Sequence, residues 1–488
     1  MIVEATRAPR ERTKLRRMTA AAVGALALAA GCASAPPEPR NHVPATALAA
    51  PGLRSGSEPS PASATAAPAR GPLTLEAAVA IALERNPDIR AAVERIGAAD
   101  ARLGEASAAF YPQVTGRLSV VRSDNPLQAF GMIVAERRFS PSLDVNHPGA
   151  TEDWRPEVAA NLSLFRGGQD WQGRAAAKLG VEAAGLERDA IRNALADAVA
   201  AAYYGALAAG AQVGVARASI AAVTGELGDA RARVEAGKAL RSDALSLEVR
   251  LAAAQEAEVR ARNAVELAHA ALRMLLALGA DEPVTLADAG GPSSVAPPAT
   301  FAGALARALA ERPEIAAAGR LVAIREHEVS AQRGAYLPRV SAFGSYGQDA
   351  PDLELSRHQD SWTVGGMVEL DIFSGFATAE RVAGAEHRLA EARIGDERAR
   401  LEVERDVRTA FLALGEARER VRVSEAATAA GDEALRLVGE QYRAGAVTVT
   451  RYLEAEAAAA DVRSRASAAR FDARRAEAGL VRAVGGWK

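Results

Sequence analysis

The sequence predicts a membrane protein of mixed α and β structure that is built from two copies of one unit. Three observations predict this class: a set of landmarks that occurs twice in the same order, two long stretches of helix-forming residues, and short segments in which apolar and polar residues alternate. A repeat outranks any local motif in deciding a fold, because each copy is one structural unit.

The first pair of landmarks fixes the offset between the two copies. Residues 83–89 recur loosely as residues 309–315, and the proline of a Tyr-Pro pair, Pro112, recurs as Pro338, 226 positions later. The residue before a proline is pushed from helical to extended geometry. Both prolines therefore mark a change from helix to strand.

The later landmarks recur at a second constant distance of 208 positions: an aromatic residue followed two places on by glycine (Phe165 and Gly167, then Phe373 and Gly375), and a second glycine (Gly237, then Gly445). We expect the aromatic-glycine pairs to mark where a strand leaves a sheet and the chain turns into a helix. The smaller offset places 18 extra residues in the first copy, within about residues 125–155. An insertion confined to one interval predicts a longer surface loop there.

Two proline-free stretches, residues 169–235 and 378–440, predict helices of roughly 100 Å each. In the first stretch, apolar residues fall seven apart as in a coiled-coil seam, at Val213, Ile220, Leu227 and Val234. Shorter helices are expected at residues 74–110, 239–279, 300–335 and 447–484.

A pair of strand-like segments precedes each long helix, at residues 114–121, 158–164, 340–346 and 362–371. One apolar and one polar face in segments of about ten residues is typical of an outer-membrane barrel strand. Two soluble hairpins resting on a helical domain would give the same pattern. Because a barrel needs about eight strands, a barrel here requires several chains, which cyclic symmetry would close.

The N-terminus reads as an export signal followed by a tether. Residues 1–31 contain a cationic stretch and the apolar run Met18–Ala30, and they precede Cys32, the only cysteine. The sequence around Cys32 resembles a bacterial lipobox, in which the cysteine carries a covalent lipid; an ordinary signal peptide with an incidental cysteine is the alternative. Residues 32–71 are rich in Pro, Ala and Ser and predict a disordered tether. No later segment has the ~20 unbroken apolar residues of a transmembrane helix.

Composition and motifs argue against nucleic-acid binding and catalysis. A net charge of −2 gives no basic face. The six histidines are scattered, and no zincin motif, phosphate-binding loop or nucleophile elbow occurs. We therefore expect no enzyme, no metal and no cofactor apart from the lipid on Cys32.

The two copies, behind a lipobox, resemble the TolC family of outer-membrane efflux proteins. Residues 72–280 form the first copy, 281–299 a linker and 300–488 the second copy, and the most specific segments are 86–89 with 312–315 and the strand exits at 164–168 and 370–375. The resemblance implies a homotrimer whose four strands per chain form a 12-stranded β-barrel, continuous with a long periplasmic α-helical barrel. It implies a passive exit duct, joined by a periplasmic adaptor to an inner-membrane pump of the RND or ABC type.

The resemblance also implies a resting gate at the far periplasmic end, near the turns at Gly237 and Gly445. Asp243 and Tyr442 stand where the family has two gate residues, and Val447 replaces the gate arginine. Further candidates are Arg451, which could substitute for that arginine, and Glu454, which matches one position of an acidic ring. Ordinary solvated helix ends are the alternative for all of these residues.

Two other functions remain open on the sequence. Type I protein secretion would use the same kind of duct, because the pump chooses the cargo. A structural periplasmic coiled-coil lipoprotein would have no pore. The strand alternation and the aromatic-glycine exits favour the duct over the second alternative.

Overall fold

The computed structural model describes residues 71–287, 298–353 and 359–487. These residues belong to one compact unit, Ala69–Lys488. The predicted signal peptide, Cys32 and nearly all of the tether lie outside the described residues, as does most of the linker between the two copies.

Eight of the described helices form four pairs of equal or nearly equal length, with one member of each pair from each half of the chain. The pairs are α2 (Leu75–Arg85) and α7 (Phe301–Glu311), α3 (Pro87–Ala108) and α8 (Pro313–Arg333), α5 (Gln169–Glu235) and α9 (Ala377–Arg443), and α6 (Arg241–Leu275) and α10 (Val449–Ala483). Both long helices have 67 residues, and both of the helices that follow them have 35. The two halves therefore share one element order.

The predicted helices at 74–110 and 300–335 are each divided in two, which corrects the sequence analysis. The breaks fall at Asn86 and Arg312, which take extended backbone angles (ψ of 132° and 125°) because each precedes a proline. The proline then opens the next helix, where a missing N–H costs nothing. At the first break the Asn86 side chain accepts a hydrogen bond from the N–H of Asp88 at 2.8 Å.

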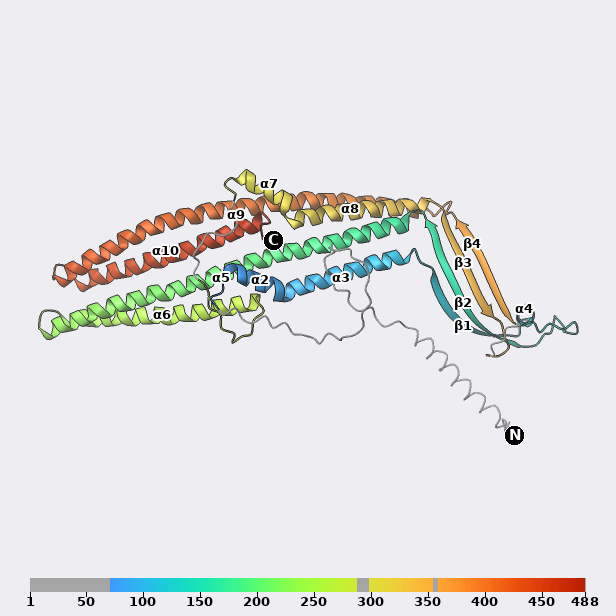
Figure 1. Cartoon of the computed structure of the whole chain (residues 1–488), viewed down its shortest axis with the longest axis horizontal. Coiled ribbons are helices and arrows are strands. Elements are labelled where there is room, and N and C mark those ends of the chain that lie inside the picture. Colours follow the sequence, from blue (N-terminus) through green and yellow to red (C-terminus); the bar gives the residue numbers. More distant parts are fainter. Residues whose placement is uncertain (1–70, 288–297, 354–358, 488) are drawn as a thin grey trace, which may run out of the picture. The chain divides into compact units, whose positions relative to one another are not determined.

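Four antiparallel strands form one sheet in the order β1-β2-β3-β4 (Figure 1). They are β1 (Gln113–Ser123), β2 (Thr151–Arg166), β3 (Arg339–Gln348) and β4 (Asp360–Glu369). Because β1 and β4 stand at the two edges, each has one neighbouring strand in this sheet.

The predicted loop at 125–155 is more ordered than expected. It contains a short helix, α4 (Pro126–Ala135), whose first turn is capped by the Asn125 side chain, which accepts from the N–H groups of Leu127 and Gln128. Its last residues, from Thr151 on, already belong to β2. The helix arises because Asn-Pro is a strong helix start, whereas the sequence analysis predicted only a loop in this interval.

The sheet lies at one end of the long helices, and the turns that join α5 to α6 and α9 to α10 lie at the other end (Figure 1). The core is distributed along this length. Two clusters of buried residues lie around α2 and α7, and a third lies beside the helix-to-helix turns.

One helix meets a looser criterion for a membrane span than the unbroken apolar run considered in the sequence analysis. Among the described residues, α5 is long and apolar enough to cross a membrane by length and composition. It contains no unbroken apolar run of about 20 residues, because charged and polar side chains interrupt it. The core helix of a soluble protein can have the same length and composition.

Candidate functional site

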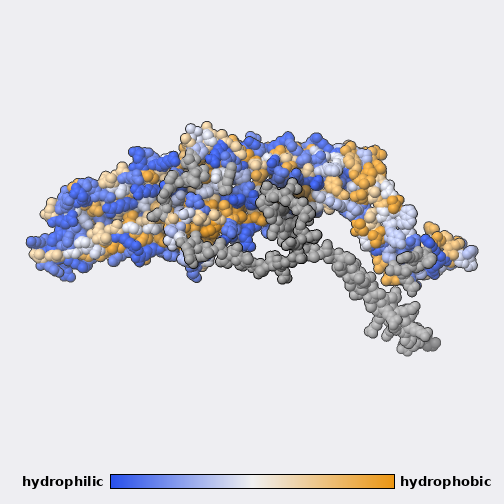
Figure 2. All heavy atoms as spheres, viewed as in Figure 1, coloured by the Kyte–Doolittle hydropathy of each residue, from blue (hydrophilic) through white to orange (hydrophobic). Residues whose placement is uncertain are grey.

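The sheet has one apolar and one polar face. Because paired residues share a face, the register gathers these side chains on the apolar face: Val114, Leu118 and Val120 of β1; Val158, Ala160 and Leu162 of β2; Val340, Ala342 and Tyr346 of β3; and Trp362, Val364 and Val368 of β4. Trp362, Val364 and Val368 are 70–75% exposed. Figure 2 shows further hydrophobic residues gathered where the helices meet the sheet. An exposed apolar surface of this kind marks contact with a membrane or a partner.

The opposite face of the sheet is mainly polar. It carries Thr115 and Arg117 of β1, Asn161 and Ser163 of β2, Ser341 and Ser345 of β3, and Thr363 and Glu369 of β4. Phe343 is an apolar exception, and its ring covers Gly365, where an added Cβ would come within 2.6 Å of the ring. The alternation predicted from the sequence therefore holds across all four strands.

The predicted junction residues lie at the changes between strand and helix. Pro112 and Pro338 directly precede β1 and β3, while Phe165 is the last residue but one of β2. Phe373 lies between β4 and α9, and its ring packs edge-on against Phe376 at 5.4 Å between centroids.

The glycines at the two strand-to-helix junctions, Gly167 and Gly375, differ in the space available for a side chain. Gly167 and Gly375 both have a positive φ, +63° and +61°, which favours glycine. At Gly167 a Cβ would also lie 1.8 Å from the carbonyl oxygen of Gly334, whereas at Gly375 it would meet open space. Gly167 thus lets the two copies of the repeat approach closely.

The two helix-to-helix turns have the same hydrogen bonds. Gly237 and Gly445, with φ of +70° and +75°, follow the ends of α5 and α9. The N–H of Lys238 donates to the carbonyl of Arg233, and the N–H of Ala446 donates to that of Gln441, both at 2.8 Å. This six-residue closure is a Schellman motif, which ends a helix with a left-handed glycine.

Tyr442, one of the predicted gate residues, is buried beside these turns. Its ring stacks on the Tyr452 ring at 5.5 Å between centroids. Burial raises the pKa of Tyr442, and the nearby carboxylate of the half-buried Asp243 acts in the same direction. The fold therefore brings Asp243 and Tyr442 into one electrostatic environment.

The arginine that covers Tyr442 comes from α5. The guanidinium of Arg233 lies 4.7 Å from the centre of the Tyr442 ring and pairs with Glu226 at 2.8 Å. Arg451, which the sequence analysis offered as the substitute gate arginine, instead pairs with Glu454 at 3.3 Å on the exposed side of α10. Among the predicted gate side chains, Tyr442 is thus buried and Asp243 is half-buried near it, whereas Arg451 and Glu454 form an exposed pair.

Two carboxylates of this region are buried, Glu226 of α5 and Glu456 of α10. The second has no part in the contacts of Tyr442 described above. It accepts hydrogen bonds from Ser219 of α5 and from Arg250 of α6. The sequence analysis missed this residue, although a signal exists. Glu456 continues the stripe of buried residues Val449, Tyr452 and Ala459 at helical spacing, where an apolar side chain is the rule.

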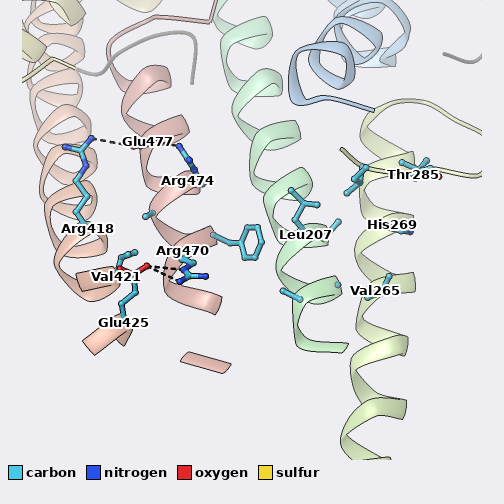
Figure 3. A pocket seen from close by; sticks show the side chains of 17 residues that line it. Leu207, Val265, His269, Thr285, Arg418, Val421, Glu425, Arg470, Arg474 and Glu477 are labelled. Carbon is cyan, nitrogen blue, oxygen red and sulfur yellow. Dashed lines mark hydrogen bonds and ion pairs between the residues drawn. The ribbon is translucent and has the colours of Figure 1, made fainter. Parts of the chain in front are cut away.

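A depression of about 1100 Å³ offers little that would select a ligand. Residues of α5, α6, α9 and α10 line it (Figure 3). Three arginines line it, and each pairs with a carboxylate: Arg418 and Arg474 with Glu477, and Arg470 with Glu425. In the described part of the chain, no group of three or more His, Cys, Asp or Glu side chains is arranged to hold a metal ion.

Comparison with protein families gives a match over most of the chain. Residues 78–278 and 304–486 match the family described as outer membrane efflux protein. These two segments cover both halves of the structure.

Curated relatives agree with this match. The chain is 26% identical over 394 residues to the outer membrane efflux protein BepC of Brucella suis. This alignment covers 78% of this chain and 79% of BepC. It is 32% identical over 193 residues to the alkaline protease secretion protein AprF of Pseudomonas aeruginosa. The latter alignment spans only 38% of this chain and 40% of AprF.

Solved structures share the fold. The channel CusC superposes with a TM-score of 0.74 at 19% identity, over 84% of this chain and 92% of that chain. The open state of the MtrE outer membrane channel of Neisseria gonorrhoeae superposes with a TM-score of 0.70 at 22% identity, over 85% and 89% of the two chains.

Proposed function

Because the chain belongs to the outer membrane efflux protein family, as its sequence motifs predicted, we propose that it is a passive exit duct in the outer membrane. One observation supports this function most strongly. A four-stranded sheet with an exposed apolar face continues directly into helices of about 100 Å. A duct needs both a lipid-facing wall and a long extension through the periplasm.

The duct is a homotrimer with a 12-stranded barrel. Four strands are too few to close a barrel, and an open sheet whose edges are β1 and β4 would expose unpaired backbone groups to lipid. Pairing of β4 in one copy with β1 in the next satisfies those groups. Three copies supply 12 strands in closed cyclic symmetry.

The polar face of the sheet lines the lumen and the apolar face contacts lipid. The loop that contains α4 lies outside the cell, and the turns at Gly237 and Gly445 point into the periplasm. The lipid on Cys32 anchors the mature chain to the outer membrane from the periplasmic side. The alternative without a pore fails to account for the exposed apolar face of the sheet.

The partners are a periplasmic adaptor and an inner-membrane pump, which supplies the energy. The duct itself carries no catalytic activity and no cofactor. Asp243, Tyr442, Arg451 and Glu454 contribute to a gate at the periplasmic end, which must close at rest because an open duct would let toxic molecules leak inward. The burial of Tyr442 beside Asp243 supports this assignment.

Protein secretion is the second candidate for the same duct. One curated relative, AprF, is described as an alkaline protease secretion protein. The duct structure serves both cargo classes, and the pump distinguishes them. Small-molecule efflux remains our first proposal because the relative with the longer alignment, BepC, is described as an efflux protein.

The direct test is reconstitution of the purified full-length protein into planar bilayers. We expect discrete single-channel conductance from a species that migrates as a trimer on a gel without boiling and as a monomer after boiling. A heat-insensitive monomer without conductance would contradict the duct.

A further inference from the structure

The segment that contains α4, residues 124–138, lies at the end of the sheet farthest from the long helices (Figure 1). It leaves β1 at one edge of the sheet, and its far end is bonded to the start of β4 at the other edge. The guanidinium of Arg137 donates to the carbonyl oxygen of Asp360 at 3.1 Å, and the side-chain amide of Gln359 donates to that of Glu136 at 3.0 Å. This segment, the α4 strap, therefore crosses the width of the sheet.

The α4 strap covers the polar face of the sheet. Its helix packs against β1 and β2, and Ala129 and Ile133, one turn apart, are the buried residues of that helix. Thr151 and Asp153 of β2 point to the same face as Asn161, because an even number of residues separates them. Both are nevertheless buried, at 8% exposure. The strap is the segment that shields them.

Three carboxylates are buried where the strap meets the sheet. They belong to Glu136 at the end of α4, Asp153 of β2 and Asp349 just beyond β3, which are 1%, 8% and 4% exposed. Trp154, next to Asp153, pairs with Ala350, which also lies beyond the end of β3. The cluster therefore lies outside the four-stranded part of the sheet.

The cluster is short of positive partners. In the part of the chain that the structure describes, neither Oε1 of Glu136 nor Oδ1 of Asp153 has a hydrogen-bond partner, which is rare for buried oxygen atoms. Arg138 pairs with Oε2 of Glu136 at 2.6 Å. Arg155 pairs with two other carboxylates, those of Asp349 and Glu157, both at 3.1 Å. Four carboxylates thus share two arginines.

Other charged side chains at this end of the sheet point to the opposite face. Arg122 and Glu152 lie opposite each other in the register and pair at 3.7 Å. The Asp360 carboxylate accepts a hydrogen bond from the Tyr346 hydroxyl at 3.2 Å, on the apolar face. On the polar face, β1 presents the apolar Val121 to Asp153. None of these groups neutralises the cluster.

A proton relieves the excess negative charge. Burial raises the pKa of Asp153 from 3.8 to about 6, and the carboxylates of Asp349 and Glu136 act in the same direction, against Arg155. Release of the strap exposes Asp153 and returns its pKa toward 3.8, so uptake of a proton favours the docked strap. A fall from pH of about 7.5 to about 5 therefore raises the docking equilibrium constant about tenfold.

We propose that the α4 strap is an acid-stabilised lid: it lies across the outer mouth of the duct when the carboxylate cluster beneath it holds a proton, and it lifts when the cluster is fully ionised. The inference rests on the proposed duct function, in which the polar face of the sheet lines the lumen and its outer end is the mouth. Three copies place three straps around one opening. The lid narrows the duct when the exterior is acidic.

The first test measures docking of the strap without any current. Ile133 is 7% exposed and Leu127, on the same helix, is 82% exposed. Ile133→Cys and Leu127→Cys are made separately in the full-length protein and labelled with a maleimide, and the unaltered protein gives the background from Cys32. The ratio of the two labelling rates removes the effect of pH on thiol chemistry. We expect this ratio to fall by up to about tenfold between pH of about 7.5 and about 5.

Three variants assign the response to the cluster. Asp153→Asn has no carboxyl group to ionise, so the labelling ratio should be low at both pH values. Glu136→Gln removes one of the opposing charges, so the midpoint of the response should shift to lower pH. Asp124→Asn is the matched control, because Asp124 is an exposed residue of the same strap, and it should keep the response of the unaltered protein.

Two results of this test would overturn the proposal. A labelling ratio that stays constant, or that rises as the pH falls, would show that a proton does not hold the strap down. A full response that persists in Asp153→Asn would show that another group takes up the proton.

The second test asks whether the docked strap narrows the duct. In planar bilayers, acidification of the side that faces the strap should reversibly lower the single-channel conductance of the unaltered protein and of Asp124→Asn. Asp153→Asn should conduct at the lower level at both pH values. Unchanged conductance while the labelling ratio falls would overturn the lid, because the strap then docks without narrowing the mouth. Absence of current at every pH would instead contradict the duct function, so the two failures are distinguishable.

Discussion

The guanidinium of Arg233 lies 4.7 Å from the centre of the Tyr442 ring, although the two residues are 209 positions apart in the chain. This contact joins the end of α5 to the end of α9. The contact also links the candidate gate residue Tyr442, which lies near Asp243, to the ion pair that Arg233 forms with the buried Glu226.

Removal of Arg233 is expected to destabilise the helical end of the molecule more than removal of an exposed arginine. Arg233→Ala leaves the Glu226 carboxylate buried and unpaired, which should cost about 3 kcal/mol. Arg451→Ala is the matched control and should cost less than about 1 kcal/mol, because its pair with Glu454 is exposed. The loss of helical circular dichroism on heating gives the stability of each variant. An equal loss of stability in the two variants would contradict the buried position of the Arg233–Glu226 pair.

The stability of this end should depend on pH through Glu226. Burial raises the pKa of Glu226 above its ordinary value of 4.5, against the opposing effect of Arg233. Between 4.5 and the raised value the folded chain keeps a proton that the unfolded chain has lost, so the contribution of this group to stability increases as pH falls. It stops increasing below the unfolded value.

Glu226→Gln removes the titrating carboxyl group, so a comparison of this variant with the unaltered protein checks the pH dependence. We expect the Tm of the unaltered protein, relative to that of Glu226→Gln, to rise as the pH falls from about 7 to about 5. A difference that stays constant, or that falls over this interval, would show that Glu226 titrates normally in the folded chain.

Alanine at the two junction glycines should have unequal effects. Gly167→Ala and Gly375→Ala both place a Cβ on a left-handed residue, a strain of roughly 1–2 kcal/mol. Only Gly167→Ala also drives that Cβ into the carbonyl oxygen of Gly334. We expect reduced assembly of heat-modifiable trimer for Gly167→Ala and near-normal assembly for Gly375→Ala; the reverse order would rule out a close approach at Gly167.

A separate prediction concerns the candidate gate residues Asp243, Tyr442 and Glu454. Asp243→Ala combined with Tyr442→Phe should raise single-channel conductance and make cells sensitive to large antibiotics, because in the proposed gate these two side chains help to hold the aperture closed. Glu454→Ala should instead reduce cation preference with little change in closure. A double variant that assembles normally but conducts like the unaltered protein would place the gate elsewhere.

The sequence predicted local structure well where glycines mark the ends of a helix or where apolar and polar residues alternate. The bounds of α5 follow from a proline-free stretch between glycines at 168 and 237, and the strands follow from alternation. The breaks at Asn86 and Arg312 were missed although each precedes a proline, because the surrounding residues are good helix formers. The order of the four strands could not be read from alternation alone, since it depends on pairing between distant segments.

The candidate site was predictable only in part. Asp243 and Tyr442 came from family resemblance, whereas Arg233 and Glu456 act through contacts across more than 200 positions, which local patterns do not contain. Glu456 could have been noticed as a carboxylate on an apolar stripe. Its partners could not, because Ser219 and Arg250 lie in the other copy of the repeat.

The central claim is that the apolar face of the sheet contacts lipid and the polar face lines a pore. Val364 and Thr363 are adjacent in β4, point to opposite faces and are both exposed in the single chain. Val364→Asp and Thr363→Asp therefore form a matched pair that differs in the face that receives the charge. The measurement is the yield of heat-modifiable trimer in the outer membrane, followed by its conductance in planar bilayers.

A charge on the lipid face near the middle of the membrane costs about 2–4 kcal/mol for a basic residue and less for an acidic one, and the trimer repeats this cost three times. We predict that Val364→Asp abolishes or sharply reduces the trimer, while Thr363→Asp assembles and increases cation preference. Normal assembly of Val364→Asp, or equal loss in both variants, would contradict a barrel with this orientation.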